Sequence, residues 1–247
     1  MNYRQRLFAN YVSGNKIFLY KAQENPDKTL FRWIRNTKRA IKPWLDQIPR
    51  TQKVLDTACG PGNILHLLRS LQFTNIHGVD ISPEQVAIAR HHFPQVVCDD
   101  TIEFLKLTQN EFALVTAFDI LEHFNKEEAF EFLDAVYNAL IPGGRIILQL
   151  PNGDSPFAGG IIFGDLTHEV TYTTVSLQHI LISCGFKDIV FQEHGPQPTS
   201  LKGIVRYGLW KFLKIILRSI HLIETGGQST GIYTRVMRAT AVCDKKI

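Results

Sequence analysis

The sequence predicts an α/β fold built around a parallel β-sheet, and three observations lead to this prediction. First, short apolar runs alternate with segments whose apolar residues recur at helical spacing over residues 51–150. Second, a glycine-rich turn at 58–62 separates an apolar strand from a helix. Third, Pro142, Gly143 and Gly144 end a helix just before another apolar strand. Such alternation implies parallel strands joined by right-handed crossovers.

The expected elements alternate regularly, beginning with a strand. We expect them at 53–57, 61–71, 75–80, 83–92, 95–98, 101–107, 112–118, 126–140 and 144–150, followed by a helix at 173–184 and strands at 187–193 and 231–242. Ser82 and Pro83 mark one helix start, because serine caps a helix and proline suits its first position. Gly185 marks a helix end.

The composition fits one α/β domain with an additional subdomain. The chain has 247 residues, and 45% of them are hydrophobic, which is ample for a buried core. The net charge of +4 and the isoelectric point near 8.8 are mildly basic. This charge favours anionic partners, but it is below that of a dedicated nucleic-acid-binding protein.

The cysteines and the apolar runs suggest where the protein resides. Cys59, Cys98, Cys184 and Cys243 are scattered along the chain. They form no Cys-x-x-Cys pair, and no histidines lie at zinc spacing, so we expect no metal site and free thiols in a reducing compartment. Neither a signal peptide nor a bilayer-spanning apolar run is found. We therefore expect a cytoplasmic protein.

The turn after the first strand has the composition of a ligand-binding loop. Glycines let a backbone approach a ligand closely, and the following helix start offers N–H groups. Ala58, Gly60 and Gly62 give a small-x-small-x-small pattern, which lacks the third glycine of the dinucleotide fingerprint. Asp56 adds an acid that suits a ligand with a positive charge. A surface turn without a ligand is the alternative interpretation.

A second strand, 76–80, ends in Asp80 about 20 residues later, where a ribose-binding carboxylate is expected. The segments Asp56–Asn63 and Gly78–Ser82 together resemble the first two motifs of class I S-adenosylmethionine-dependent methyltransferases. This resemblance implies a Rossmann-like sheet of seven strands, mostly parallel with an antiparallel last strand, and helices on both faces. It also implies S-adenosyl-L-methionine as the cofactor.

The same resemblance implies a set of cofactor-binding residues at the ends of the first four strands. They are Asp56, Ala58, Gly60, Gly62, Asn63, Asp80, Ile81, Asp100, Thr101, Phe118 and Asp119. Asp80 corresponds to the acid that holds the ribose. Asp100 corresponds to the acid that takes the adenine amino group, although it could instead simply cap the following helix. Phe118 and Asp119 correspond to residues near the methionine end.

Two histidines are the candidate catalytic residues. His123 lies in a Leu-Glu-His sequence after the fourth strand, where the family places a glutamate and a histidine on the floor of the active site. His168 lies in segment 165–177, which resembles a pattern of bacterial methyltransferases associated with polysaccharide and small-metabolite biosynthesis. An imidazole can accept the proton of an acceptor hydroxyl, so His168 is either a general base or a residue that orients the acceptor.

The expected reaction is methyl transfer to a small-molecule acceptor, with a hydroxyl of a sugar, lipid-linked compound or other metabolite as the favoured group. The sequence at 119–122 differs from the Asn/Asp-Pro-Pro-aromatic motif of base-flipping enzymes, which argues against a nucleic-acid substrate. Two alternatives stay open. One is a nicotinamide-dependent oxidoreductase on a related fold, and the other is a non-catalytic cofactor-binding protein.

The two flanking regions are expected to shape the acceptor side. Residues 1–50 form an N-terminal helical cap on a methyltransferase domain at 51–247, with Tyr11 and Tyr20 as candidate ligand contacts. An amphipathic helical insertion at 200–225 carries basic residues on one half of its surface between 202 and 221. It could pack as a lid, form a homodimer, or dock on the inner face of a membrane.

Overall fold

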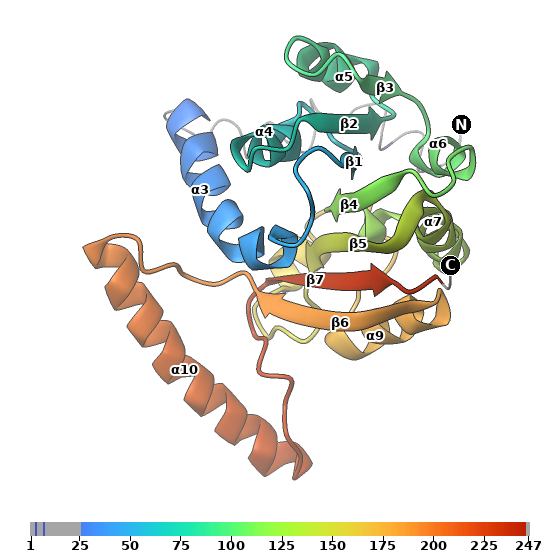
Figure 1. The fold of residues 1–247 in the computed structure, drawn as a ribbon. Helices are drawn as coiled ribbons and strands as arrows, with labels where there is room; N and C mark the ends of the chain where they lie inside the picture. The colour runs from blue at the N-terminus through green and yellow to red at the C-terminus, as the bar shows by residue number, and fades with distance from the viewer. Residues whose placement is uncertain (1–2, 4–6, 8–25, 246–247) are drawn as a thin grey trace.

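The computed structural model describes residues 3, 7 and 26–245, and its centre is a mixed seven-stranded sheet (Figure 1). The strands are β1 (Lys53–Thr57), β2 (Asn75–Asp80), β3 (Val96–Cys98), β4 (Phe112–Phe118), β5 (Leu140–Pro151), β6 (Phe186–Glu193) and β7 (Val236–Cys243). Their order in the sheet is β3-β2-β1-β4-β5-β7-β6, and β7 alone runs antiparallel to its neighbours β5 and β6. The predicted fold class is confirmed, although the last strand begins at Val236 rather than 231.

Helices cover both faces of the sheet. They are α3 (Pro26–Leu45), α4 (Asn63–Ser70), α5 (Pro83–Arg90), α6 (Thr101–Lys106), α7 (Lys126–Ala139), α8 (Gly159–Ile162), α9 (Thr174–Ser183) and α10 (Leu201–Thr225), with a short 3₁₀ turn η2 (Leu121–His123). Successive strand residues point to opposite faces. Val54 accordingly packs with α3, α4 and α5 on one face, while Leu55 packs with α6, α7 and α9 on the other.

The strand order reverses direction at β1. The chain builds β1, β2 and β3 outward on one side and then crosses back to place β4 on the other side of β1. In open α/β sheets, ligands bind outside the carboxyl ends of the strands at such a switch point. Two non-glycine residues there, Ala58 after β1 and Asp119 after β4, have positive φ angles of 51° and 53°. Strained backbone of this kind is concentrated at functional sites.

Several predicted helix ends are present with the expected caps. The hydroxyl of Ser82 accepts a hydrogen bond from the Gln85 N–H at 3.4 Å and caps α5. Thr173 caps α9 in a reciprocal arrangement with Ser176. Gly185 follows the end of α9 with φ of 89°, a conformation that glycine adopts without strain.

Helix α10 extends away from the sheet (Figure 1), and none of its 25 residues is buried. The carboxylate of Glu193, at the end of β6, anchors it. Lys214 Nζ lies 2.9 Å from both oxygens of Glu193, and Trp210 Nε1 donates to one of them at 3.1 Å. The helical insertion expected at 200–225 is therefore present as α10, but it is not a lid packed on the core.

Two further expectations concern the tyrosines of the N-terminal region and the absence of membrane-spanning segments. Tyr11 and Tyr20 lie outside the described residues. Of the N-terminal region, Tyr3 is described, and its hydroxyl contacts the carboxylate of Glu169 beside His168. Among the described residues, no helix is both long enough and apolar enough to cross a membrane.

Candidate functional site

The glycine-rich turn after β1 is fastened to β2 by Asp80. Asp80 Oδ2 accepts a hydrogen bond from the Gly60 N–H at 2.8 Å, and Oδ1 accepts one from the Ser82 N–H at 2.8 Å. Each carboxylate oxygen has two lone-pair positions, so Asp80 keeps capacity for two ligand hydroxyls. Gly60 and Gly62 have φ angles of 52° and 93°, which explains why glycine occupies both positions.

Asp56 has a different environment from the one expected. Its side chain is buried within the sheet, and Oδ1 accepts a hydrogen bond from the Thr116 hydroxyl at 2.6 Å. Burial raises the pKa of Asp56 to about 8, with a smaller contribution from the charge of Asp80. Burial therefore favours the neutral form of this carboxyl, while the hydrogen bond from Thr116 favours the ionised form.

The residues expected to hold the adenine lie after β2 and β3. Ile81, directly after β2, is 68% exposed. Asp100 caps α6, because its Oδ1 accepts hydrogen bonds from the N–H groups of Ile102 at 2.9 Å and Glu103 at 3.1 Å. Asp100 therefore caps α6 through Oδ1, and its expected bond to the adenine amino group stays a prediction. Thr101 is buried at the first position of α6. Asn63, the remaining expected residue from the turn after β1, is the first residue of α4.

Phe118 and Asp119 lie at the end of β4, and a polar chain supports the second of them. Gln149 donates from Nε2 to Asp119 Oδ2 at 3.2 Å and accepts at Oε1 from the buried Arg238 at 2.9 Å. Burial lowers the pKa of Arg238 to about 10, and the negative charge of Asp119 opposes this shift. These hydrogen bonds link the buried guanidinium of Arg238 on β7, through Gln149, to the carboxylate of Asp119, a candidate ligand-binding residue.

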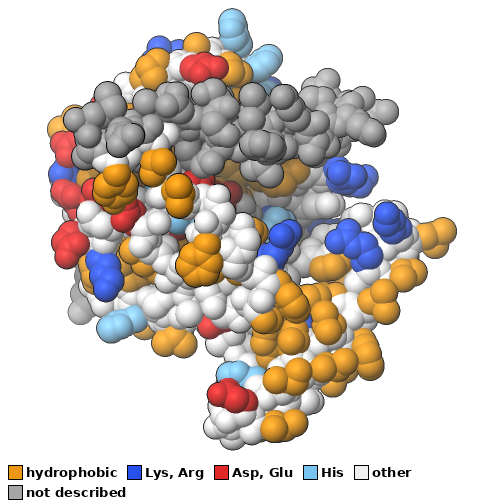
Figure 2. Space-filling view, turned by 180° about the vertical axis from the view of Figure 1, so that it is seen from behind, with side chains coloured by type: hydrophobic (Ala, Val, Ile, Leu, Met, Phe, Trp, Pro, Cys, Tyr) orange, Lys and Arg blue, Asp and Glu red, His pale blue; other side chains and the backbone are white. Residues whose placement is uncertain are grey.

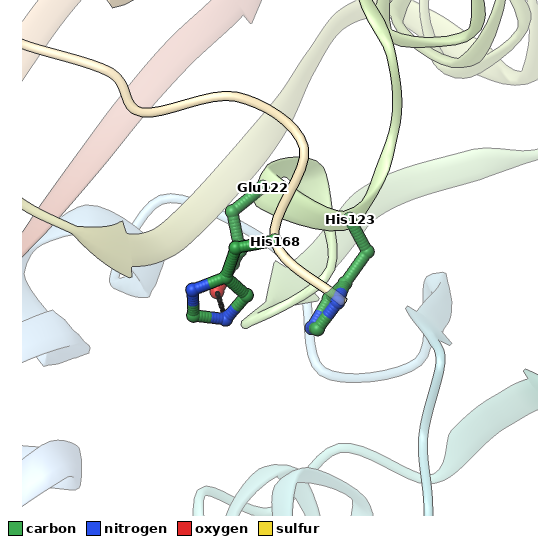
Figure 3. Close-up of side chains that lie close together, drawn as sticks. All are labelled: Glu122, His123 and His168. Carbon is green, nitrogen blue, oxygen red and sulfur yellow. Dashed lines mark ion pairs between the residues drawn. The ribbon is translucent and has the colours of Figure 1, made fainter. Parts of the chain in front are cut away.

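Beyond β4 the structure brings three side chains together: Glu122 and His123 from η2, and His168 from the loop before α9 (Figure 3). One nitrogen or oxygen atom from each residue lies within 4.8 Å of the others. His168 Nε2 is 4.0 Å from Glu122 Oε1, and the two imidazole rings meet edge to face with centroids 4.8 Å apart. We refer to these three residues as the Glu122 cluster.

The second ring nitrogen of each histidine is held by the backbone. His123 Nδ1 lies 3.2 Å from the carbonyl oxygen of Thr167, and His168 Nδ1 lies 3.2 Å from that of Ile162. A carbonyl oxygen only accepts, so Nδ1 carries the proton in both rings and Nε2 carries the lone pair. Both candidate catalytic histidines therefore have the tautomer that a base or a metal ligand needs at Nε2.

The loop carrying His168 is fixed to η2 by its backbone and by a short turn. The carbonyl oxygen of Glu122 accepts hydrogen bonds from the N–H groups of Glu169 at 2.8 Å and Val170 at 3.2 Å. The hydroxyl and the N–H of Thr167 both donate to Asp165 Oδ1. Burial would raise the pKa of Asp165, but these bonds outweigh it and lower the pKa. The turn thereby adds a negative charge beside the cluster.

The resemblance implied that Glu122 lies on the floor of the active site, but neither Glu122 nor Tyr172 was among the candidate catalytic or cofactor-binding residues. Glu122 is only 3% exposed, and its Oε2 has no hydrogen-bond partner among the residues that the structure describes. The same is true of the buried Tyr172 hydroxyl. Burial, then the charges of Asp119 and Asp165, raise the pKa of Glu122 well above its ordinary value. Glu122 lies in the Leu-Glu-His sequence and Tyr172 lies in segment 165–177, the two motifs that identified the histidines. Their place in these motifs was the signal available in the sequence.

The comparisons with known proteins concern the sequence family and the fold of this chain. A family model described as "Methyltransferase domain" matches residues 28–189, well over half of the chain. No curated protein is similar enough to the sequence to count as a match.

Among solved structures, a SAM-dependent methyltransferase from Archaeoglobus fulgidus aligns with a TM-score of 0.62 at 20% identity, over 85% of this chain and 94% of that one. Phosphoethanolamine N-methyltransferase 2 from Haemonchus contortus aligns with a TM-score of 0.61 at 18% identity, over 99% of this chain and 61% of that one. An S-adenosylmethionine-dependent methyltransferase from Mesorhizobium loti aligns with a TM-score of 0.57 at 18% identity, over 82% and 97%. These likenesses concern the fold, whereas the family match concerns the sequence, and the chain therefore belongs to the methyltransferase-domain family and has the class I fold of S-adenosylmethionine-dependent methyltransferases.

Proposed function

We propose that this protein transfers the methyl group of S-adenosyl-L-methionine to a hydroxyl of a small-molecule acceptor. The observation that carries the proposal is the convergence of two groups of residues at the carboxyl edge of one sheet. The Asp80-fastened turn lies after β1 and β2, and the Glu122 cluster lies after β4. A methyltransferase needs a cofactor site and an acceptor site next to each other, and this edge offers both.

The residues of the first group fit the cofactor. Asp80 has lone pairs for two ribose hydroxyls, and Gly60 and Gly62 keep the turn free of side chains where a ligand must approach the backbone. Ile81 offers an apolar surface for the adenine ring, and Asp119 offers a carboxylate for the ammonium group of the methionine part. When bound, the cofactor supplies an activated methyl group on a positively charged sulfur.

The residues of the second group would position the acceptor and take its proton. Holding the acceptor oxygen in line with the methyl group contributes roughly 7–11 kcal/mol by orientation. The oxygen forms a bond to the methyl carbon while the carbon–sulfur bond breaks and its electron pair goes to sulfur. His168 Nε2, the nitrogen with the lone pair, would accept the hydroxyl proton, which typically adds 10²–10⁴-fold to the rate.

The acceptor class is supported by the site but is open to test. The Haemonchus contortus enzyme with the same fold was crystallised with phosphomonomethylethanolamine, an amine acceptor. A neutral amine would need no base, whereas the two histidines with lone pairs at Nε2 favour a hydroxyl. Mass spectrometry after incubation with sugars, lipid-linked sugars and amines would separate the two. Methylation of amines alone would contradict the hydroxyl proposal.

The cofactor step is tested first by calorimetric titration with S-adenosyl-L-homocysteine. We expect binding of one molecule per chain. An absence of binding at millimolar ligand would overturn the proposal, and preferential binding of NAD would favour the alternative of an oxidoreductase. Cofactor binding without turnover in a broad acceptor panel would favour a non-catalytic protein.

Helix α10 supports a second part of the proposal, peripheral docking on an anionic membrane surface, in bacteria the inner face of the cytoplasmic membrane. One side of α10 faces the body through Trp210 and Lys214. The opposite side is apolar and exposed: Leu201, Ile204, Val205, Leu209, Phe212, Ile215, Ile216, Ile220, Leu222 and Ile223. Figure 2 shows these hydrophobic side chains gathered along the helix.

Charge complementarity favours a lipid surface over a second copy of the chain. At 100° per residue, Lys202 and Arg206 lie on one flank of the apolar side, and Lys211 and Arg218 lie on the other. Two basic flanks around an apolar stripe match anionic headgroups above acyl chains. In a homodimer, the same flanks of the two copies would bring like charges together. Docking would bring the active-site edge to an amphipathic or lipid-linked acceptor.

Vesicle flotation tests this docking. We expect the protein to float with vesicles containing phosphatidylglycerol and not with pure phosphatidylcholine, and expect the binding to weaken with salt. The double variant Phe212→Asp, Ile216→Asp should abolish flotation. The control Leu107→Asp changes a side chain that is 86% exposed at the end of α6 and should float normally. Failure to float, with concentration-dependent dimerisation through α10 instead, would overturn the membrane proposal.

A further inference from the structure

We propose that the Glu122 cluster is a divalent transition-metal site with Glu122, His123 and His168 as ligands. Among the described residues, no other group of three histidine, cysteine, aspartate or glutamate side chains converges in this way. Two imidazoles and one carboxylate form a ligand set suited to ions such as Zn²⁺, Mn²⁺ and Fe²⁺. The inference deepens the proposed function and rests on it for the role of the acceptor, but cation binding can be measured without any acceptor.

The first support is the orientation of the two rings. In metal sites, a ligating histidine donates its other N–H to a carbonyl or carboxylate, which fixes the tautomer and the ring. Here His123 and His168 each direct Nδ1 to a backbone carbonyl oxygen, of Thr167 and Ile162 respectively. The Thr167 hydroxyl also lies 2.9 Å from His123 Nδ1 and itself donates to Asp165. The resulting chain from imidazole to hydroxyl to carboxylate supports one ligand from behind.

The second support is the unpartnered carboxylate. Glu122 Oε2 is buried without a hydrogen-bond partner, although a buried polar atom normally has one. Glu122 Oε1 is 4.0 Å from His168 Nε2, which is beyond hydrogen-bond distance, and His168 Nδ1 is already engaged by Ile162. Glu122 is therefore not placed as the orienting acid of a histidine base. Glu122 Oε1 and His168 Nε2 are both electron-pair donors, and a cation between them would serve both.

The spacing is compatible with a metal ion after a small adjustment. Ligand atoms about 2.1 Å from a tetrahedral ion are about 3.4 Å apart. The cluster atoms lie within 4.8 Å of one another. Side-chain rotations that move these atoms by about 1 Å would bring them to the distances that a metal ion needs. Asp119 and Asp165, whose negative charges act on Glu122, add electrostatic attraction for a cation.

A cation at this position would change how the acceptor is activated. With three protein ligands, an ion keeps open positions for the oxygen of an acceptor hydroxyl. Coordination would lower the pKa of that hydroxyl, its proton would pass to water, and its oxygen would form the bond to the methyl carbon as the carbon–sulfur bond breaks. His168 would then act as a ligand rather than as the base.

Calorimetry and electron paramagnetic resonance with Mn²⁺, repeated with Zn²⁺ by calorimetry, test the site on the full chain after chelator treatment. We expect one ion per chain. Glu122→Gln and His168→Gln should each weaken binding at least tenfold, while His92→Gln, which removes a histidine on the surface after α5, should bind normally. Nitrogen hyperfine coupling in the Mn²⁺ spectrum should disappear stepwise as the histidines are replaced.

Two outcomes would overturn the inference. One is the absence of stoichiometric binding at millimolar Mn²⁺ and Zn²⁺, and the other is unchanged affinity in both ligand variants. Circular dichroism identifies a variant that fails to fold, in which case the remaining ligand variant decides. Titration of the same samples with S-adenosyl-L-homocysteine separates the two proposals: cofactor binding without metal binding leaves the methyltransferase proposal standing, and metal binding without cofactor binding leaves only the metal site.

Discussion

The proposed cofactor side and the proposed acceptor side of this protein lie at the same edge of the sheet, but they are assembled in different ways. On the cofactor side, the Gly60 N–H and the Asp80 carboxylate come from one strand–helix–strand unit and meet directly. On the acceptor side, Glu122 and His123 meet His168 across a long connection that contains β5 and α7. In the proposed function, the first side would bind the cofactor through backbone geometry and one acid. The second side would bind the acceptor through side chains that come from separate segments of the chain.

The difference has a functional consequence. A site formed within one unit is reproduced wherever that unit folds, which suits a cofactor common to many enzymes. A site formed between distant loops changes with those loops, which suits an acceptor that differs from enzyme to enzyme. The two sides should therefore be separable by mutation, and the predictions below test this from the largest effect to the smallest.

Replacement of His168 should break the acceptor side alone. We expect His168→Gln to lower kcat by on the order of 10²–10⁴-fold, because the variant loses the Nε2 lone pair that serves either as base or as ligand. The dissociation constant of S-adenosyl-L-homocysteine should stay within about twofold. Steady-state kinetics and calorimetry on one preparation provide both numbers. A comparable loss in His92→Gln would show that the effect is not specific to the site.

Replacement of Asp80 should break the cofactor side alone. We expect Asp80→Ala to weaken S-adenosyl-L-homocysteine binding by about 1.5–3 kcal/mol, because charge-assisted hydrogen bonds to the ribose are lost. At saturating cofactor, kcat should change little. Asp99→Ala, which removes an exposed acid after β3, is the matched control and should bind normally. An unchanged affinity for Asp80→Ala would contradict the ribose assignment.

Replacement of Asp56 should change the pH dependence of stability more than either function. Because burial raises the pKa of Asp56 from 3.8 to about 8 in the folded protein, the folded state holds a proton that the unfolded chain releases above about pH 4. This contribution to stability is present in full below about pH 4 and is lost as pH rises toward 8, by about 1.4 kcal/mol per pH unit.

Asp56→Asn keeps the side-chain shape and cannot ionise, so its free energy of unfolding should fall less steeply between pH 5 and 7. Urea denaturation at several pH values measures the two slopes. Parallel slopes for the wild type and the variant would indicate that Asp56 is ionised in the fold.

Local patterns were sufficient to predict much of the architecture. The strands at 53–57, 75–80 and 112–118 occur at the predicted residues, because alternating short apolar runs and glycine turns are signals within ten or fifteen residues. The edges of the long β5 and of β7 were less accurate. Pairing between strands decides where a strand ends, and residues far apart in the chain make that pairing.

The candidate site was predictable in its parts but not in its assembly. The motifs identified His123 and His168 separately, and the absence of zinc spacing led to the expectation of no metal site. Spacing rules detect ligands at regular intervals within a short segment. In the proposed metal site two of the ligands are adjacent and the third comes from a distant loop. The role of Asp100 as a helix cap likewise depends on backbone geometry that composition does not express.

The sequence by itself determined the α/β fold, the glycine turn with its acid on the next strand, and the amphipathic character of residues 202–221, since each depends on residue order over a short window. Only the tertiary structure decided that Glu122, His123 and His168 meet, that the Asp56 carboxyl is buried against Thr116, and that the apolar side of α10 stays exposed. The physical reason is that a periodic pattern shows which residues share a face, whereas what that face contacts depends on how distant segments pack against it.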